Sequence, residues 1–197
     1  MKKAIKIFYK ISFLIILLFS YEVESKILSI GDENSKVTVK VFSSLTCPAC
    51  ANFHSKIYYQ LKKEFIDSGL VKFEHHPFPL DLAALNAEII LRCNVDNSKK
   101  FKLLSKIYEK QRVWAVGSDI NKINDSIKKI GLELNLENKK MSDCLQNEKK
   151  QDEILNQRIE AQKKYKIEST PTILINEKKY SGKIEYLEFK KTIEKNL

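Results

Sequence analysis

The chain has 197 residues, 43% of them hydrophobic, and its 35 basic and 25 acidic side chains give a formal net charge of +10. This length suits one compact domain with an elaboration and is sufficient for a hydrophobic core. The lysines are mixed with glutamates throughout the predicted helices. The charge therefore indicates solvated surfaces and argues against a nucleic-acid partner, which needs a basic stripe with interleaved aromatic side chains.

Residues 1–25 have the pattern of a secretory signal peptide. The basic segment MKKAIKIFYK precedes the apolar run ISFLIILLFS, and the small residue Ser25 offers a cleavage site, with Ser20 as a second candidate. The uncharged run from Ile11 to Tyr21 is shorter than the ~20 apolar residues of a membrane span. An uncleaved signal anchor is the alternative. In both cases we expect residues 26–197 to be exported.

A strand, a helix and a second strand follow. The segment SKVTVKVFSS alternates valines with polar residues, which is typical of a strand. Behind it, apolar residues recur at helical spacing up to a predicted C-cap at Gly69, namely Phe53, Ile57, Leu61 and Phe65. LVKFEHHPF is the second predicted strand, ended by Pro77. Three such elements in about 40 residues predict a βαβ unit with parallel strands.

Helical periodicity then continues over about 80 residues, and we place a helical insertion at about 82–160. After it, TPTILIN predicts a strand, EK a turn, KYSG a partner strand and IEYLEFKKTIEKNL a closing helix. The order without the insertion is β-α-β-β-β-α. This is the order of an α/β thioredoxin fold, a central mixed sheet flanked by helices, interrupted here by an α-helical domain.

Cys47 and Cys50 are separated by two residues, a spacing used both for metal binding and for redox chemistry. A zinc site needs four ligands, usually from two such pairs or from one pair with two histidines. This sequence has a single pair, and its only imidazoles are His54, His75 and His76. A copper site built from the two cysteines and histidines is the metal-binding alternative.

The redox interpretation accounts for more of the local pattern. A strand before the pair and a helix after it place Cys47 at a helix N-terminus, where free N–H groups and the helix dipole stabilise a thiolate. Pro48 suits the first helical turn because its nitrogen carries no proton that would need a partner. Cys50 lies one turn on, where it can resolve a mixed disulfide formed at Cys47. We therefore predict a redox-active disulfide and neither a metal nor another cofactor.

Thr170 and Pro171 precede the third predicted strand. In a thioredoxin-type site, a loop ending in a cis-proline faces the cysteine pair at this point of the fold. We expect the Thr170 backbone to pair with an extended substrate and Pro171 to pack on the disulfide. The alternative is a proline at a strand start, where it removes no hydrogen bond of the sheet.

The chain resembles the DsbA-like thiol–disulfide oxidoreductases of Gram-negative bacteria, in particular the alphaproteobacterial type, in SLTCPACANFH, FPLDLAALNAEIILRC, QRVWA, CLQN and STPTILINEKKYSG. The resemblance runs from about Val37 to the C-terminus. It implies a periplasmic enzyme that introduces disulfide bonds into unfolded or partly folded exported proteins. It also implies a membrane partner that reoxidises the enzyme.

Three positions depart from the family pattern. Ala49 stands where the best-known members have a histidine that helps hold the thiolate, and Thr170 stands where the strongest oxidants carry valine. Val41 replaces a buried glutamate that aids proton transfer to the resolving cysteine. We expect Ala49, together with Pro48, to tune the site to a moderate oxidant, and a disulfide isomerase or reductase of the same fold is the alternative. Because only a short segment precedes Val37, we expect a monomer without a dimerisation domain.

Cys93 and Cys144 lie outside the active-site motif, in predicted helices of the insertion. An exported chain with an even number of cysteines favours a structural disulfide between them. Two free core cysteines are the alternative. The insertion should also frame a groove beside Cys47, with Phe78, Tyr108 and Trp114 as candidate lining residues or as core.

Overall fold

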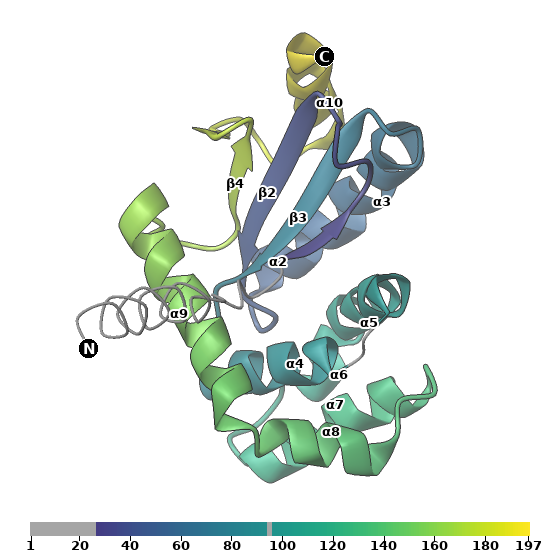
Figure 1. Cartoon of the computed structure of the whole chain (residues 1–197), viewed down its shortest axis with the longest axis vertical. Coiled ribbons are helices and arrows are strands. Elements are labelled where there is room, and N and C mark those ends of the chain that lie inside the picture. Colours follow the sequence, from purple (N-terminus) through teal and green to yellow (C-terminus); the bar gives the residue numbers. More distant parts are fainter. Residues whose placement is uncertain (1–26, 94–95) are drawn as a thin grey trace, which may run out of the picture.

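The computed structural model describes residues 27–93 and 96–197, so the predicted signal peptide lies outside the described residues (Figure 1). The strands of these ranges form one mixed sheet in the order β1-β3-β2-β4-β5. β2 runs parallel to β3 and the other neighbours are antiparallel. The bounds are β1 Leu28–Ile30, β2 Val37–Ser43, β3 Val71–Pro77, β4 Thr172–Ile175 and β5 Lys178–Lys179.

This arrangement confirms the thioredoxin fold and the parallel βαβ unit. β1 was not predicted, because three residues are too few to show an alternating pattern. Its partner is β3, against which Ile30 pairs with Phe73. Gly31 ends the strand at a φ of +109°, and a side chain there would collide with the backbone oxygen of Val71.

The helix after Cys47 is continuous from Pro48 to Ile66 but changes its winding. It consists of α2 Pro48–Phe53, the π-helical turn η1 His54–Tyr58, α3 Tyr59–Leu61 and a second π turn, η2 Lys62–Ile66. Its apolar residues recur at steps of four, which would drift by about 40° per step around a regular α-helix. The wider π turns offset this drift, so that all four stay buried: Phe53, Ile57, Leu61 and Phe65.

The helical block lies at the end of the sheet where α2 begins (Figure 1). Its helices are α4 Leu82–Arg92, α5 Asn97–Glu109, α6 Gln111–Trp114, α7 Ile120–Leu132, α8 Asn138–Leu145 and α9 Glu148–Tyr165. Short polar side chains cap the starts of α4, α7 and α9, as Asp81, Asp119 and Asn147 accept hydrogen bonds from the first turn of each helix. α9 then leads back to the sheet and packs on β3. Each helix of the described ranges is too short or too polar to span a membrane.

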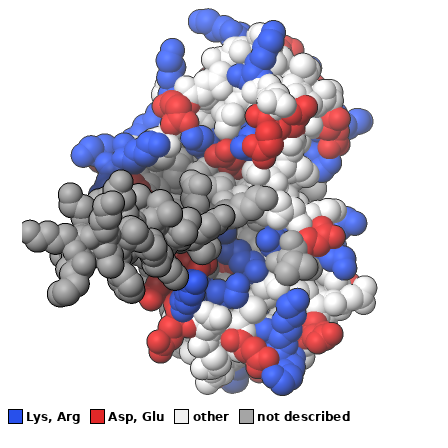
Figure 2. All heavy atoms as spheres, viewed as in Figure 1, with Lys and Arg blue, Asp and Glu red and all other residues white. Residues whose placement is uncertain are grey.

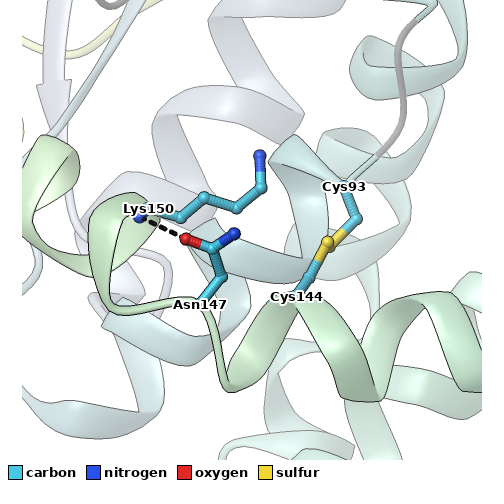
Figure 3. Close-up of a disulfide and its surroundings, with 4 residues drawn as sticks. All are labelled: Cys93, Cys144, Asn147 and Lys150. Atoms are coloured by element: carbon cyan, nitrogen blue, oxygen red, sulfur yellow. Dashed lines mark hydrogen bonds between the residues drawn. A yellow bond between two sulfur atoms is a disulfide. The ribbon is translucent and has the colours of Figure 1, made fainter.

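A disulfide joins Cys93 to Cys144 inside this block, with the two Cα atoms 6.1 Å apart (Figure 3). Cys93 caps the C-terminus of α4, one residue beyond the helix in which it was expected, and Cys144 lies within α8. Both pack with Leu85, Ile89 and Ile154 in a separate small core. The bond thus ties the C-terminus of α4, the first helix of the block, to α8.

Near the end of the chain, the hairpin turn between the last two strands lies one residue earlier than predicted. The hairpin between β4 and β5 turns at Asn176 and Glu177, which have φ values of 46° and 67°, and not at Glu177 and Lys178. The Asn176 carboxamide favours this turn because it accepts a hydrogen bond from the Thr38 backbone at 2.8 Å. The partner strand is Lys178–Lys179 and shares only Lys179 with the predicted KYSG. The closing helix α10, Tyr186–Asn196, packs on η1.

Charged side chains of both signs are mixed over the molecular face in Figure 2. Ion pairs join distant segments, as between Lys190 and Glu64 at 2.6 Å, or neighbouring turns of one helix, as between Lys139 and Asp143 at 2.7 Å. This distribution agrees with the solvated lysine-rich faces inferred from the sequence.

Candidate active site

Cys47 lies in the connection between β2 and α2, at the N-terminus of the helix. It is the N-cap residue, with extended backbone angles, and Pro48 is the first helical residue. The Cys47 carbonyl accepts the first helical hydrogen bonds, from the N–H groups of Cys50 at 3.1 Å and Ala51 at 3.2 Å. The sulfur of Cys47 thus lies at the positive end of the helix dipole, beside the N–H groups of Ala49 and Cys50.

The two thiols are free, and they differ in surroundings and in pKa. Cys47 is 8% exposed, next to the exposed Pro48 and Ala49, whereas Cys50 is 1% exposed. A hydrogen bond from the Cys50 thiol, aided by Thr170 and by the N–H groups of Cys50 and Ala49, outweighs burial and lowers the pKa of Cys47 to about 5. Burial, followed by the adjacent Cys47 sulfur, raises the pKa of Cys50 far above its ordinary value. At neutral pH, Cys47 is the thiolate and Cys50 the thiol.

This asymmetry predicts how the stability of the reduced protein depends on pH. The folded pKa of Cys47, about 5, lies below its ordinary value of 9.0, so the unfolded state binds more protons between these two values. The reduced protein should therefore gain free energy of unfolding, relative to the oxidised protein, as the pH rises from about 5 to about 9. Denaturant titrations of both forms over this range would measure the free energy of unfolding of the reduced protein minus that of the oxidised protein. If this quantity stays constant or falls as the pH rises, the lowered pKa is contradicted.

The Thr170–Pro171 peptide bond is cis, and this loop faces Cys47. The Cys47 thiol, when protonated, donates a hydrogen bond to the Thr170 carbonyl at 3.3 Å. The buried Thr170 hydroxyl interacts with the two cysteine sulfurs and lowers the pKa values of both cysteines. The four predicted site residues Cys47, Cys50, Thr170 and Pro171 therefore form one cluster, although they come from distant parts of the chain.

Thr170→Val should raise the pKa of Cys47 and leave the fold unchanged. Valine keeps the volume and the backbone carbonyl but removes the hydroxyl that favours the thiolate. The expected rise is about 0.5 to 1 unit, the order expected of one hydrogen bond of about 1 kcal/mol. The pH dependence of Cys47 alkylation would measure it. Thr172→Val, two residues on in β4, is the matched control and should leave the profile in place.

Two side chains of the helical block hold the active-site loop, and sequence reasoning missed both. The buried Gln111 amide, from α6, donates hydrogen bonds to the carbonyls of Leu45 at 2.8 Å and Cys47 at 3.0 Å. Asp81 accepts a hydrogen bond from the Thr46 hydroxyl at 2.7 Å while it caps α4. A capping signal at Asp81 is readable in the sequence, but its second partner depends on the tertiary fold.

A buried charged cluster lies where β3 meets α4. His75 is 2% exposed and contacts the fully buried Glu88 at 2.5 Å, and Arg92 reaches the other Glu88 oxygen at 3.3 Å. Although burial acts to raise it, the charges of His75 and Arg92 hold the pKa of Glu88 below its ordinary value. Val41, which stands in place of the family's glutamate, pairs with His75 across the sheet. His75 in turn contacts Glu88, so the helical block supplies a carboxylate one side chain away from this position.

His75→Ala should lower the free energy of unfolding by about 3 kcal/mol, since it leaves the Glu88 charge buried with Arg92 alone. The double variant His75→Leu/Glu88→Leu should recover most of this loss, because it removes both charges and keeps apolar volume. Urea denaturation of the wild type and these variants would test the pair. A single variant as stable as the wild type would show that His75 does not compensate Glu88.

The three histidines have partners other than the cysteines. The ring nitrogens of His54, His75 and His76 lie within 3.0 Å of Ser105, Glu88 and Glu74, respectively. Within residues 27–93 and 96–197, no group of three or more histidine, cysteine or acidic side chains is arranged to hold a metal ion.

The aromatic candidates for a groove are all buried. Phe78 is 4% and Trp114 1% exposed, and the Trp114 indole donates a hydrogen bond to the Ile107 carbonyl at 2.8 Å. These two belong to the core. Tyr108, 6% exposed, differs because it also lines a pocket beside the active-site helix.

Comparisons with known proteins agree with this site. The family model described as "Thioredoxin" matches residues 23–195. "Disulfide bond formation protein D" of Bacillus subtilis is 34% identical over 178 residues, which cover 85% of this chain and 76% of that protein. The chain spans less of two Rickettsia relatives, 60% of one at 26% identity and 46% of the other at 29%.

Solved structures share the fold. The alpha-DsbA1 structure of Wolbachia pipientis superposes with a TM-score of 0.79 at 24% identity, covering 87% of this chain and 90% of that one. The oxidised BdbD structure of Bacillus subtilis gives a TM-score of 0.70 at 25% identity and covers 86% of this chain and 92% of that one.

Proposed function

Because the chain belongs to the DsbA-like branch of the thioredoxin family, the thiol–disulfide oxidoreductases, we propose that it introduces disulfide bonds into unfolded or partly folded exported proteins in the periplasm. In this proposal Cys47 is the nucleophile and Cys50 the resolving cysteine. Thr170 and Pro171 bind the extended client backbone, and Pro48 and Ala49 tune the redox potential. A membrane partner reoxidises the reduced enzyme.

The proposed reaction is an exchange of two electrons and one disulfide. A client thiolate attacks the Cys47 sulfur, the Cys47–Cys50 bond breaks, and Cys50 takes up a proton. A second client thiolate then attacks the client sulfur of the mixed disulfide, so that Cys47 leaves as a thiolate. The client is oxidised to a disulfide, and the enzyme is reduced to the free thiol pair.

The low pKa of Cys47 is the observation that carries the oxidase direction. A thiolate with a pKa of about 5 is a good leaving group in the second step. It also stabilises the reduced enzyme relative to its disulfide, which makes the disulfide an oxidant. Cys50 has the complementary property, since its buried thiol stays protonated until it must close the disulfide.

The second candidate is an isomerase or reductase of the same fold, which Ala49 and Thr170 favour. Equilibration of Cys47–Cys50 with a glutathione series separates the two. We expect the reduction potential of Cys47–Cys50 to lie well above the ~−270 mV of thioredoxin. We also expect catalytic amounts of the enzyme, supplied with oxidised glutathione, to oxidise a reduced, unfolded client. A potential near that of thioredoxin, with no client oxidation, would reject the oxidase.

A further inference from the structure

A pocket of about 350 Å³ lies in the helical block, between α4, α7, α8 and the start of α9 (Figure 1). Five of its eleven lining residues carry carboxamides, namely Asn86, Asn121, Asn124, Gln146 and Gln151. Each carboxamide presents N–H donors and a carbonyl acceptor, the same kinds of group that a peptide bond presents. The wall of this carboxamide pocket can therefore form hydrogen bonds with a polypeptide main chain.

Two of these carboxamides hold each other in place. Asn86 is 9% exposed, and its NH₂ group donates a hydrogen bond to the Asn124 side-chain oxygen at 3.0 Å. This bond uses one donor of Asn86 and one acceptor site of Asn124, so both amides retain capacity to donate and accept further hydrogen bonds. Because the bond links α4 to α7, the pair needs little additional ordering when a ligand binds.

The other side chains of the pocket favour an uncharged ligand. Lys128 and Asp125 form an ion pair at 2.9 Å, so each compensates the charge of the other. Leu82, Ile120 and Leu145 add apolar surface, and Leu82 is 56% exposed. An extended, uncharged peptide segment fits this combination, with its peptide groups at the carboxamides and its side chains on the apolar residues.

The pocket is connected to the active-site loop through the start of α4. Thr46, the residue before Cys47, donates a hydrogen bond from its hydroxyl to Asp81 at 2.7 Å, and Asp81 caps α4. Leu82, the first residue of α4, lines the pocket, and Asn86 lies about 6 Å further along the helix axis. An extended chain advances about 3.3 Å per residue, so a client segment about six residues from its reacting cysteine can reach these carboxamides.

We propose that the carboxamide pocket binds the extended main chain of a client, about six residues from the cysteine that reacts at Cys47. This inference rests on the proposed exchange function but holds for an oxidase, an isomerase or a reductase alike. The cis-proline loop pairs with the client beside its reacting cysteine, and the carboxamide pocket holds the client at a second point. Two points of contact keep an unfolded client on the enzyme until its second thiol has reacted, without requiring a particular client sequence.

The test measures whether a longer client chain accelerates exchange. Oxidised enzyme is mixed with a reduced peptide that carries two cysteines among glycine, serine and alanine, so that exchange yields the peptide disulfide and reduced enzyme. A long peptide has about eight residues beyond each cysteine, enough to reach the pocket, and a short one has none. Below saturation, the wild type should react with the long peptide at least about tenfold faster, the advantage expected of two hydrogen bonds to carboxamides. Equal rates for the two peptides would overturn the proposal.

The double variant Asn86→Leu/Asn124→Leu removes both members of the hydrogen-bonded pair together, so neither amide is left without its partner. It should reduce the advantage of the long peptide to about twofold or less. Asn138→Leu/Asn156→Leu is the matched control, because it makes the same two substitutions at exposed positions outside the pocket, and it should keep the advantage. Glutathione exchange at Cys47 should stay near the wild-type rate in both double variants.

An advantage that survives in Asn86→Leu/Asn124→Leu, or that both double variants lose equally, would reject the carboxamide pocket as the client site. If Asn86→Leu/Asn124→Leu does not fold, Asn121→Ala/Gln146→Ala decides, because both of its side chains are exposed. This variant should lower the advantage at least about threefold, and an unchanged advantage would reject the site. Failure to oxidise a client catalytically, with the advantage of the long peptide intact, would reject the oxidase alone.

Discussion

Replacing Cys50 with alanine is expected to reduce the turnover of disulfide formation at least about a thousandfold and to leave Cys47 joined to glutathione or client proteins. The oxidised enzyme needs the Cys47–Cys50 bond, and no bulk thiol matches the effective concentration of a sulfur one helical turn away. Cys93 and Cys144 cannot substitute, since they are bonded to each other in another core. Non-reducing gels and mass spectrometry would detect the trapped species.

The same variant has a second readout. The Cys50 hydrogen bond is the largest cause of the lowered Cys47 pKa, so Cys50→Ala should move this pKa upward from about 5. Cys50→Ser is the matched control, because its hydroxyl still donates a hydrogen bond while it cannot form a disulfide. Both variants should lose turnover, but the serine variant should keep more of the low pKa. A Cys47 pKa equal to that of the wild type in Cys50→Ala would show that the helix N-terminus and Thr170 suffice.

Loss of the second disulfide should cost about 4 kcal/mol in the free energy of unfolding. The Cys93–Cys144 bond closes a loop with a sequence separation of 51, and its removal frees that loop in the unfolded chain. Urea denaturation of Cys93→Ala/Cys144→Ala should show this loss, while the rate of glutathione exchange at Cys47 stays near that of the wild type. The bond is remote from the active-site loop, so a matching loss of exchange rate would contradict a purely structural role.

A thiol count provides the control for this prediction. The variant Cys47→Ser/Cys50→Ser retains only Cys93 and Cys144, so the denatured, unreduced protein should contain no free thiol. Two free thiols would reject the bond and with it the expected loss of stability.

The order of the fold was readable because each large element carries its own periodicity. Alternating valines indicated β2, and apolar residues at steps of four indicated the active-site helix. The π turns, β1 and the position of the hairpin turn were not readable. The π turns and β1 depend on contacts with neighbouring strands and helices. The position of the hairpin turn depends on the hydrogen bond between Asn176 and Thr38.

The candidate active site likewise contains residues that the sequence predicts and residues that only the structure identifies. Cys47 and Cys50 stand out because two cysteines three positions apart lie between a predicted strand and a predicted helix. Pro171 stands out because it directly precedes the third predicted strand. Gln111 and Glu88 are ordinary residues of helical segments, and their importance comes from what the fold places beside them. Pattern analysis therefore located the candidate reacting cysteines and named Tyr108 as a possible lining residue, but it did not find the groups that hold the loop or compensate buried charge.

The two outer strands of the sheet are short, three residues in β1 and two in β5, and β5 carries the exposed lysines Lys178 and Lys179. An enzyme that works among unfolded chains meets many extended segments that could add to an open sheet edge and seed aggregates. Short, charged edges offer such segments little to pair with. In the proposed function this leaves the loop at Pro171 as the place where clients pair, and we expect the enzyme to resist aggregation with its own substrates.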